Sequence, residues 1–281
     1  MIGAAAGMAL TETAWAKINL ALHVRRRRED GYHELETLFA FVDQGDLLTA
    51  APAPAPAPRD ELVTLGEFAP QIDDPFGNIV AQALAALPRA EGWRVTLDKR
   101  LPVAAGLGGG SADAGAVFRM VERASGLPDD WAARAAKLGA DVPACVESRT
   151  CIGRGTGTEL ASGPQDLAGM PVLLVNPRLP LATGPVFRGW DGVDRGAMPH
   201  GTARDIALQG RNDLEAPALA LCPAIGAVLD ALRASSPWLA RMSGSGATCF
   251  ALYDSAAARD DAERAIRAAQ PDWWLLGGAL R

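Results

Sequence analysis

The stretch P-V-A-A-G-L-G-G-G-S-A-D-A-G, residues 102–115, decides the fold of this 281-residue sequence. Four of the five residues 106–110 are glycine, so the backbone there can adopt conformations closed to other residues and can approach a ligand closely. Apolar residues then recur at helical spacing, at Ala114, Val117 and Val121. The pattern predicts a glycine-rich loop over 102–110 and a helix that begins at Ser111.

Such a loop followed by a helix is typical of an anion site. Ser111 is expected to cap the helix, whose free N–H groups and positive dipole end would face the loop. We therefore predict a phosphate site. The stretch contains no Gly-Lys-Ser/Thr and lacks the spacing of a dinucleotide fingerprint. The alternative is a flexible strand-to-helix connection with surplus glycine.

A second segment, A-K-I-N-L, places a lysine and an amide on one face of a predicted strand. Because side chains alternate along a strand, Lys17 and Asn19 share a face. An inward-facing lysine requires an acidic or phosphate partner. The alternative is a lysine at a solvated sheet edge.

Two later segments also carry candidate polar groups. In L-G-A-D-V-P, residues 138–143, Asp141 stands alone in an apolar setting at an expected helix start, so it is either a site carboxylate or an N-cap with Pro143 in the first turn. The segment R-M-S-G-S-G-A-T-C-F, residues 241–250, is a second glycine loop, expected between a helix and a strand.

The remaining periodicity predicts strands and helices in both halves of the chain, hence an α+β fold with two domains, 1–165 and 166–281. Residues 153–157 are expected to form a turn, and the Pro-Ala segment 50–58 an exposed extended loop. The predicted strands are 13–24, 34–50, 93–97, 171–176, 248–253 and 274–280, and the predicted helices are 78–90, 111–124, 129–138, 214–233 and 255–269.

Composition excludes several classes of protein. Hydrophobic residues make up 49% and charged residues 21%, so the chain can bury a core. A net charge of −6 gives no basic field for nucleic acid. The run Arg25–Arg28 is followed at once by two acidic residues, which favours a solvated turn over a contact with an anionic ligand.

The chain is also expected to be soluble and cytoplasmic. No window holds 18 uninterrupted apolar residues, and the first ten residues lack the basic region of a signal peptide. The four cysteines form no C-x-x-C pair and have no nearby histidine, which favours free thiols in a reducing compartment and disfavours zinc.

The motifs, in their order along the chain, resemble the GHMP kinase superfamily over nearly the whole sequence. Those that carry the resemblance are A-K-I-N-L-A-L-H-V, D-G-Y-H-E-L-E-T-L-F, G-L-G-G-G-S-A-D-A, L-G-A-D-V-P, N-D-L-E and S-G-S-G-A-T-C-F. D-G-Y-H, residues 30–33, is similar to the branch of the superfamily that acts on 4-diphosphocytidyl-2-C-methyl-D-erythritol in the non-mevalonate isoprenoid pathway.

The resemblance implies a two-domain GHMP kinase fold, with an N-terminal ribosomal-S5-like domain, a C-terminal ferredoxin-like domain and the active site between them. It also implies an ATP-dependent kinase that uses Mg²⁺ and phosphorylates the 2-hydroxyl of that cytidyl diphosphate. A monomer or a homodimer is expected, without nucleic-acid or membrane partners. The open alternatives are another GHMP kinase, acting on mevalonate, homoserine or a sugar, and a non-catalytic nucleotide-binding regulator.

The resemblance further implies residue roles. Asp141 would be the general base, and Lys17 would orient and polarise it together with the hydroxyl. Substrate would be bound by Asn19, by Tyr32 stacked on the cytosine, by His33 at the edge of the base, and by Thr183 and Phe187, the latter as a second stacking aromatic. The ATP phosphates would be wrapped by Pro102, Val103, Ala104, Ala105, Gly106, Leu107, Gly108, Gly109, Gly110, Ser111 and Ala112.

One position departs from the superfamily pattern. Members usually have two serines after the glycines, whereas Ser111 is followed here by Ala112, so a hydroxyl contact to phosphate or metal is missing at the second position. No second acidic ligand is evident near the loop, so Mg²⁺ is expected on phosphate oxygens and water. Lys99, directly before the loop, is a further candidate for nucleotide binding.

Overall fold

The structure is a computed structural model that describes residues 9–53, 60–72 and 78–281. The N-terminal segment discussed as a signal peptide lies mostly outside the described residues, as does most of the Pro-Ala segment 50–58. Within the part of the chain that is described, no helix has the length and apolar character needed to cross a membrane.

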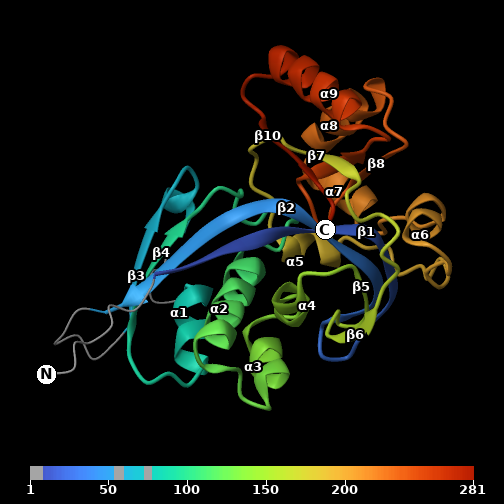
Figure 1. Ribbon diagram of the computed structural model, residues 1–281. Coiled ribbons are helices and arrows are strands. Elements are labelled where there is room, and N and C mark those ends of the chain that lie inside the picture. Colours follow the sequence, from blue (N-terminus) through green and yellow to red (C-terminus); the bar gives the residue numbers. More distant parts are fainter. Residues whose placement is uncertain (1–8, 54–59, 73–77) are drawn as a thin grey trace, which may run out of the picture.

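A long antiparallel pair of strands, β1 (Leu10–Arg27) and β2 (His33–Pro52), runs through the molecule (Figure 1). Their side chains alternate between two hydrophobic clusters. Phe39 and Phe41 enter one cluster, and Leu38 and Ala40 enter the other. β1 and β2 are buried on both faces over much of their length. They confirm the strands predicted from the sequence at 13–24 and 34–50.

The first sheet is built on β2. It has the order β3-β4-β2-β5-β6, and β1 pairs with β2 off this path. Helices α1 to α4 lie along one side of β1 and β2, where α2 packs on β1 (Figure 1). The bounds are β3 Glu61–Leu65, β4 Trp93–Asp98, β5 Cys151–Gly155, β6 Glu159–Ser162, α1 Ile79–Ala86, α2 Gly109–Ser125, α3 Trp131–Leu138, α4 Val142–Glu147 and a 3-10 turn, η1, at Ala69–Gln71.

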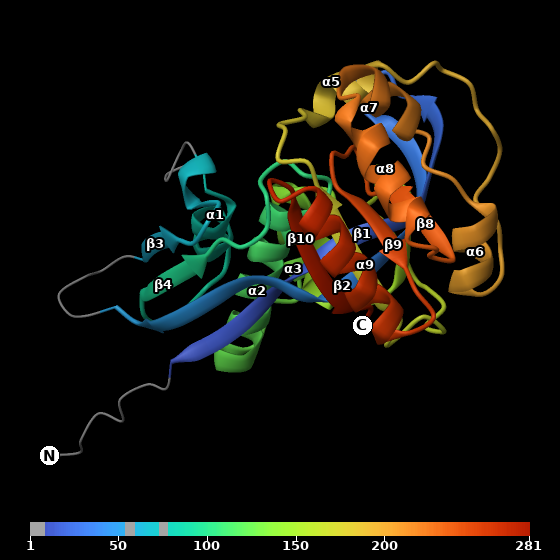
Figure 2. The same cartoon turned by 90° about the horizontal axis from the view of Figure 1, so that it is seen from above.

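The second sheet has the order β10-β7-β9-β8, and α8 and α9 pack against it (Figure 2). Apolar residues of this second sheet, among them Val172 and Phe250, pack against the second face of β1 and β2 in one shared hydrophobic cluster. The bounds are β7 Pro171–Asn176, β8 Leu239–Met242, β9 Cys249–Leu252, β10 Trp274–Ala279, α5 Thr183–Arg188, α6 Ala203–Gln209, α7 Glu215–Leu221, α8 Ala224–Ala234 and α9 Ala256–Ala269.

The α+β prediction is confirmed by these two sheets. Strands of the first sheet end at Ser162 and those of the second begin at Pro171. The division into domains 1–165 and 166–281 stays a prediction, because β1 and β2 share a buried cluster with residues of the second sheet.

Two predictions about the second half are wrong. The single helix over 214–233 is two helices, α7 and α8, which are separated at Cys222-Pro223. Proline has no N–H for a helical hydrogen bond and clashes with the preceding turn, so the first helix ends before it. The second glycine loop joins the strands β8 and β9 and does not follow a helix, because Leu239–Met242 pairs with β9.

Two predictions about the first half are also wrong. Gly153, expected in a turn, lies in β5 opposite Thr37, and a Cβ on it would be 2.7 Å from the ring of Phe39. The turn begins only after Gly155. The turn predicted for Arg25–Arg28 is wrong for residues 25–27, which belong to β1, where Arg25 pairs with Glu36 and Asp194, whereas Arg28 lies at the turn that follows.

Candidate active site

The central feature is a buried ion pair between β1 and the start of α4. Lys17 Nζ lies 2.9 Å from Asp141 Oδ2, and Lys17 is only 4% exposed. The Asp141 side chain remains 30% exposed, so one edge of the carboxylate faces solvent. The predicted acidic partner of Lys17 is confirmed, and the alternative of a lysine at a solvated edge is wrong.

The backbone position of Asp141 explains why it is free to form this pair. Asp141 is the N-cap residue of α4, as its sequence context predicted, and Pro143 lies in the first turn. Its side chain makes no capping hydrogen bond, so the N-cap interpretation of the carboxylate is wrong.

Asn19 holds the ammonium from the same strand face. Lys17 Nζ donates a hydrogen bond to Asn19 Oδ1 at 3.0 Å, and Asn19 Nδ2 donates to Thr37 Oγ1 at 2.8 Å. The hydroxyl of Thr37 donates in turn to the carbonyl of Ala21. This chain of donors settles the orientation of the amide, with its oxygen toward Lys17.

The predicted glycine-rich loop lies against this pair. The backbone N–H of Lys17 donates a hydrogen bond of 2.9 Å to the carbonyl oxygen of Leu107 in this loop. A Cβ on Gly108, whose φ is +59°, would be 2.9 Å from Lys17 Cε and 3.7 Å from Asp141 Oδ2. Glycine is required at 108 both for its left-handed backbone and for this close approach.

The helix after the loop begins two residues earlier than predicted. Gly109 is its first residue, Gly108 is its N-cap, and no side chain caps it. Ser111 therefore lies within the first turn, and its predicted capping role is wrong. The first N–H groups of a helix have no partner within the helix, so the N-terminus of α2 offers backbone donors beside Asp141.

Ala112, the departure from the superfamily pattern, does not face this opening. Its side chain is 1% exposed and belongs to the hydrophobic cluster beneath α2. Its backbone N–H donates to the carbonyl of Gly108 at 2.7 Å, so Ala112 contributes no side chain to the opening.

A second glycine loop, Ser243–Gly246, braces the first. Ser243 Oγ donates to Gly106 O at 2.8 Å and accepts from Asn19 N at 3.2 Å. A Cβ on Gly106 would be 2.3 Å from Ser243 O, so the backbones of the two loops are in direct contact and leave no room for a side chain at position 106. Ser243 was not among the predicted site residues. The motif S-G-S-G-A-T-C-F, which begins at Ser243, was the signal in the sequence, and it does not reveal the partner loop.

The second loop is itself held by Asn212. Asn212 Nδ2 donates to the carbonyls of Met242 and Gly244, both at 2.8 Å. On the other side of the loop, Thr183 Oγ1 lies 3.0 Å from Ser245 Oγ. The N-D-L-E motif at 212–215 was visible in the sequence, but this positioning contact was not.

Of the predicted substrate aromatics, the structure brings His33, at the start of β2, into contact with Phe187 of α5. The ring of His33 lies 5.1 Å from that of Phe187 and 5.8 Å from that of Trp190. Tyr32 is 64% exposed and projects from the β1–β2 turn. Burial lowers the pKa of His33, and the charge of Arg27 lowers it further, so the imidazole is neutral near pH 7. Sequence reasoning missed Trp190.

Lys99 does not have the free ammonium that its place before the loop suggested. It is 3% exposed and donates to Asp46 and, at 2.8 Å, to Asp113 Oδ2. Burial alone would lower the pKa of Lys99, but the two carboxylates raise it above its ordinary value. Both of these contacts are with the protein itself, so the prediction of Lys99 as a nucleotide ligand is not supported.

A cleft of about 390 Å³ lies beside the glycine-rich loop. Residues from the segment before α1 and from both ends of the loop line it, including Gln71, Ile79, Val103 and Gly110. It therefore adjoins the N-terminus of α2 and offers apolar walls next to backbone donors.

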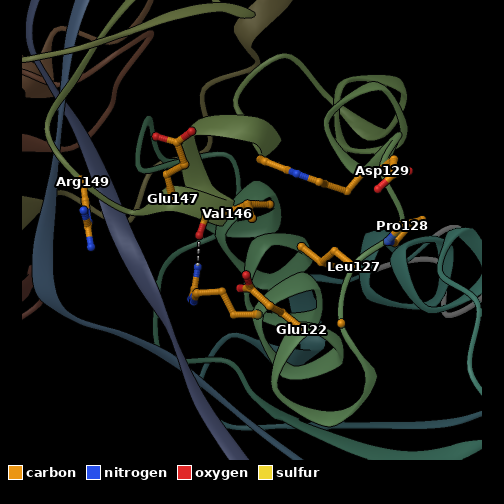
Figure 3. A pocket seen from close by; sticks show the side chains of 10 residues that line it. Glu122, Leu127, Pro128, Asp129, Val146, Glu147 and Arg149 are labelled. Atoms are coloured by element: carbon orange, nitrogen blue, oxygen red, sulfur yellow. Dashed lines mark hydrogen bonds between the residues drawn. The ribbon is translucent and has the colours of Figure 1, made fainter.

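A larger cleft of about 730 Å³ lies away from the predicted residues, between the end of α2, the start of α3 and the end of α4 (Figure 3). Arg119 lines it but donates to the carbonyl of Val146 and to Ser148 Oγ, and pairs with Glu12. The lining combines three acidic residues, Glu122, Asp129 and Glu147, with two arginines, so this cleft does not favour an anion.

The described residues provide no ready-made metal cage. No group of three or more His, Cys, Asp or Glu side chains converges within the ranges 9–53, 60–72 and 78–281. The four cysteines are free and buried.

Comparison with known proteins adds independent findings. The family model described as "GHMP kinases N terminal domain" matches residues 78–149, and "GHMP kinases C terminal" matches residues 200–272. A 4-diphosphocytidyl-2-C-methyl-D-erythritol kinase of Novosphingobium aromaticivorans is 73% identical over 98% of this chain and 94% of its own length. A protein of the same name from Erythrobacter litoralis is 62% identical over 97% of this chain and 100% of its own length.

Solved structures agree with the sequence comparisons. A crystal structure of 4-(cytidine 5'-diphospho)-2C-methyl-D-erythritol kinase superposes with a TM-score of 0.77 at 32% identity, covering 96% of this chain and 99% of that one. Homoserine kinase from Cytophaga hutchinsonii superposes with a TM-score of 0.72 at 14% identity, over 100% of this chain and 97% of its own, which shows the fold alone.

Proposed function

The chain belongs to the 4-diphosphocytidyl-2-C-methyl-D-erythritol kinase family of GHMP kinases, and we propose that it transfers the γ-phosphoryl group of ATP to the 2-hydroxyl of that cytidyl diphosphate. The observation that carries the proposal is the Lys17–Asp141 pair, 2.9 Å apart, at the N-terminus of α2. A carboxylate, an ammonium and a set of backbone donors are the groups that this reaction needs.

Phosphoryl transfer depends mainly on positioning and on charge stabilisation. The residues 102–112 wrap the triphosphate, with the backbone donors of the first turn of α2 on its oxygens. The second glycine loop keeps this cradle rigid through Ser243 and Gly106. The cleft beside the loop receives the nucleoside of ATP.

Asp141 receives the proton of the substrate hydroxyl. As the hydroxyl oxygen forms its bond to the γ-phosphorus, the bond from that phosphorus to the bridging oxygen breaks and ADP leaves. Lys17, held by Asn19 and by Asp141, keeps the carboxylate turned toward the hydroxyl and offers positive charge to the transferring group. Its compact ammonium suits a site in which Gly108 packs closely on the lysine side chain.

Mg²⁺ would arrive with ATP, because the described residues form no carboxylate cage and Mg²⁺ usually keeps substrate phosphates and waters as ligands. When bound, it neutralises part of the triphosphate charge. We assign no protein side chain to it.

The cytidyl end of the substrate extends toward the β1–β2 turn. Tyr32 and Phe187 stack on the cytosine, and neutral His33 hydrogen-bonds its edge. Asn19 and Thr183 contact the substrate nearer the reacting hydroxyl, each from a position that other hydrogen bonds hold in place.

A coupled assay with purified protein tests the proposal. It compares ADP release with the cytidyl diphosphate, mevalonate and homoserine as acceptors, and identifies the product by mass and phosphorus NMR. Preference for the cytidyl diphosphate with a phosphate on the 2-hydroxyl is expected. Preference for either other acceptor would assign a different GHMP activity, and an absence of ATP turnover with every acceptor would favour a binding regulator. A cytoplasmic location and a monomeric or homodimeric state complete the proposal.

A further inference from the structure

Three buried charged side chains lie directly beneath the phosphate loop and join its two ends. Asp46 Oδ1, from β2, accepts hydrogen bonds from the backbone N–H groups of Arg100, at 2.5 Å, and Leu101, at 2.7 Å, directly before the loop. Asp113 lies in the second turn of α2, directly after the loop. Lys99 donates to both carboxylates. We refer to Asp46, Lys99 and Asp113 as the loop triad.

The loop triad also forms the floor of the site. Lys99 and Asp113 line the cleft of about 390 Å³ beside the loop. A Cβ on Gly109 would be 3.1 Å from Lys99 Nζ and 3.8 Å from Asp46 Oδ2, so the first residue of α2 rests on the ammonium. The three side chains are each at most 3% exposed. Their net charge therefore acts on the loop through protein and with little screening by water.

The charges of the loop triad do not balance when both carboxylates are ionised. Two carboxylates and one ammonium leave one negative charge beneath a loop that binds a polyanion. Asp113 Oδ1 is buried and has no hydrogen-bond partner among the described residues, whereas both oxygens of Asp46 are bonded. A buried unpaired carboxylate oxygen is costly, and a proton on Asp113 removes the charge.

We propose that the loop triad sets the affinity of the phosphate loop for ATP, because it ties both ends of the loop together and is neutral only while Asp113 holds a proton. Asp46, Lys99 and Asp113 are then positioning residues, which act on the phosphates of ATP through the backbone of the loop, and Lys99 and Asp113 also line the cleft assigned to the nucleoside. The proposal rests on the proposed function only in taking ATP as the ligand.

The titration of Asp113 supports this assignment. Burial raises its pKa to about 8; the charge of Asp46 also raises it, and Lys99 opposes the shift. The elements packed around α2 supply few other charges near Asp113. Helix α1 has no charged residue, and Lys17 of β1 is paired with Asp141 before α4. The other charged groups and histidines on these elements are Glu12, His23 and Arg25–Arg27 of β1, His33, Glu34, Glu36 and Asp43 of β2, Arg119, Glu122 and Arg123 of α2, Arg134 and Lys137 of α3, and Glu147 of α4. Of these, Glu12 is paired with Arg119 and Arg123.

Binding of Mg-ATP to the full-length protein tests the proposal without the cytidyl substrate. The dissociation constant, measured by calorimetry from pH 6.5 to 9.5, should rise on the order of tenfold between pH 7 and pH 9, since one negative charge appears near the phosphates. In Asp113→Asn, which keeps the shape and an acceptor for Lys99, this rise should disappear. Asp230→Asn, at an exposed position of α8, is the matched control and should keep the wild-type profile.

A wild-type dissociation constant that does not change over this range, or an Asp113→Asn variant with the wild-type pH dependence, would overturn the proposal. A direct measurement covers the case in which the variant does not fold. The carboxyl carbon resonances of the wild-type protein, labelled at aspartate, should include one buried group that titrates near pH 8. Titration of all aspartates below pH 6 would overturn the proposal as well.

The two hypotheses fail separately. If the wild-type protein binds ATP with the expected pH dependence but does not phosphorylate the cytidyl diphosphate, the proposed function is wrong and the loop triad stands. If it phosphorylates that substrate while ATP affinity is independent of pH, the loop triad is wrong and the proposed function stands.

Discussion

The ammonium of Lys17 lies 2.9 Å from the carboxylate of Asp141, and Gly108 of the loop packs so closely on this pair that a Cβ there would be 2.9 Å from Lys17 Cε. β1 presents the lysine and the short connection between α3 and α4 presents the aspartate. Because Lys17 is buried and Asp141 is partly exposed, the ion pair contacts the protein on one side and solvent on the other.

Asp141→Asn should lower the turnover number on the order of 10²- to 10⁴-fold, the usual contribution of a positioned base. ATP affinity should change little, since the proposed contacts of the loop with ATP are made by its backbone. Steady-state kinetics with the cytidyl diphosphate measure both. Glu147→Gln, an exposed change on the same short helix, is the control and should leave turnover unaltered. Wild-type turnover in Asp141→Asn would disprove the role of the base.

Gly108→Ala should reduce turnover on the order of 10²-fold, because a Cβ at 2.9 Å from Lys17 Cε displaces the ammonium from Asp141. The left-handed φ of +59° adds backbone strain. Kinetics should be read beside thermal unfolding, so that a loss of activity in a folded protein is distinguished from unfolding. Gly226→Ala in α8, where the nearest atom is 3.6 Å away, should keep full turnover; equal activity of the two variants would refute the steric argument.

Tyr32→Ala should weaken binding of the cytidyl substrate by about 1–3 kcal/mol, the usual contribution of one stacked base. The ring is 64% exposed in the protein alone, so its removal should leave stability nearly unchanged. Tyr32→Phe keeps the stacking face and should retain the wild-type Michaelis constant. An unaltered Michaelis constant in Tyr32→Ala would argue against the stacked pose.

His23 should make the protein sensitive to acid. The ring is fully buried, its Nε2 accepts from the N–H of Arg211, and its Nδ1 therefore donates to Gly196 O. Burial lowers the pKa of His23, and the nearby charge of Arg211 lowers it further. Below pH 6.5 the unfolded chain binds the proton more readily than the folded protein, so the free energy of unfolding should fall as the pH decreases from 6.5.

Urea unfolding at pH 5 and pH 8 measures this effect. The difference in free energy between the two values should shrink in His23→Gln and should persist in His200→Gln, at an exposed position. An undiminished difference in His23→Gln would assign the acid sensitivity to other groups.

Most elements could be predicted from local pattern because their signals are local. The alternation along β1 and β2, the helical spacing after the glycines and the isolated Asp141 all lie within short windows of sequence. Where the pattern was ambiguous, contacts with distant residues decided the outcome. Gly153 joined a strand because Phe39 packs on it, and Leu239–Met242 became a strand because β9 lies beside it.

The stretch 102–115 by itself determined that a glycine-rich loop leads into a helix here, and it predicts a backbone cradle for an anion, since glycine conformations and helix N-termini are properties of the local chain. Which lysine serves that cradle was decided only by the tertiary structure. Lys17 and Lys99 both lie near polar residues in the sequence, but Lys99 meets Asp46 and Asp113 in the interior, while Lys17 meets a carboxylate that remains open to solvent. The role of a buried charged side chain depends on the groups that it contacts in the folded protein, and those groups come from distant parts of the chain.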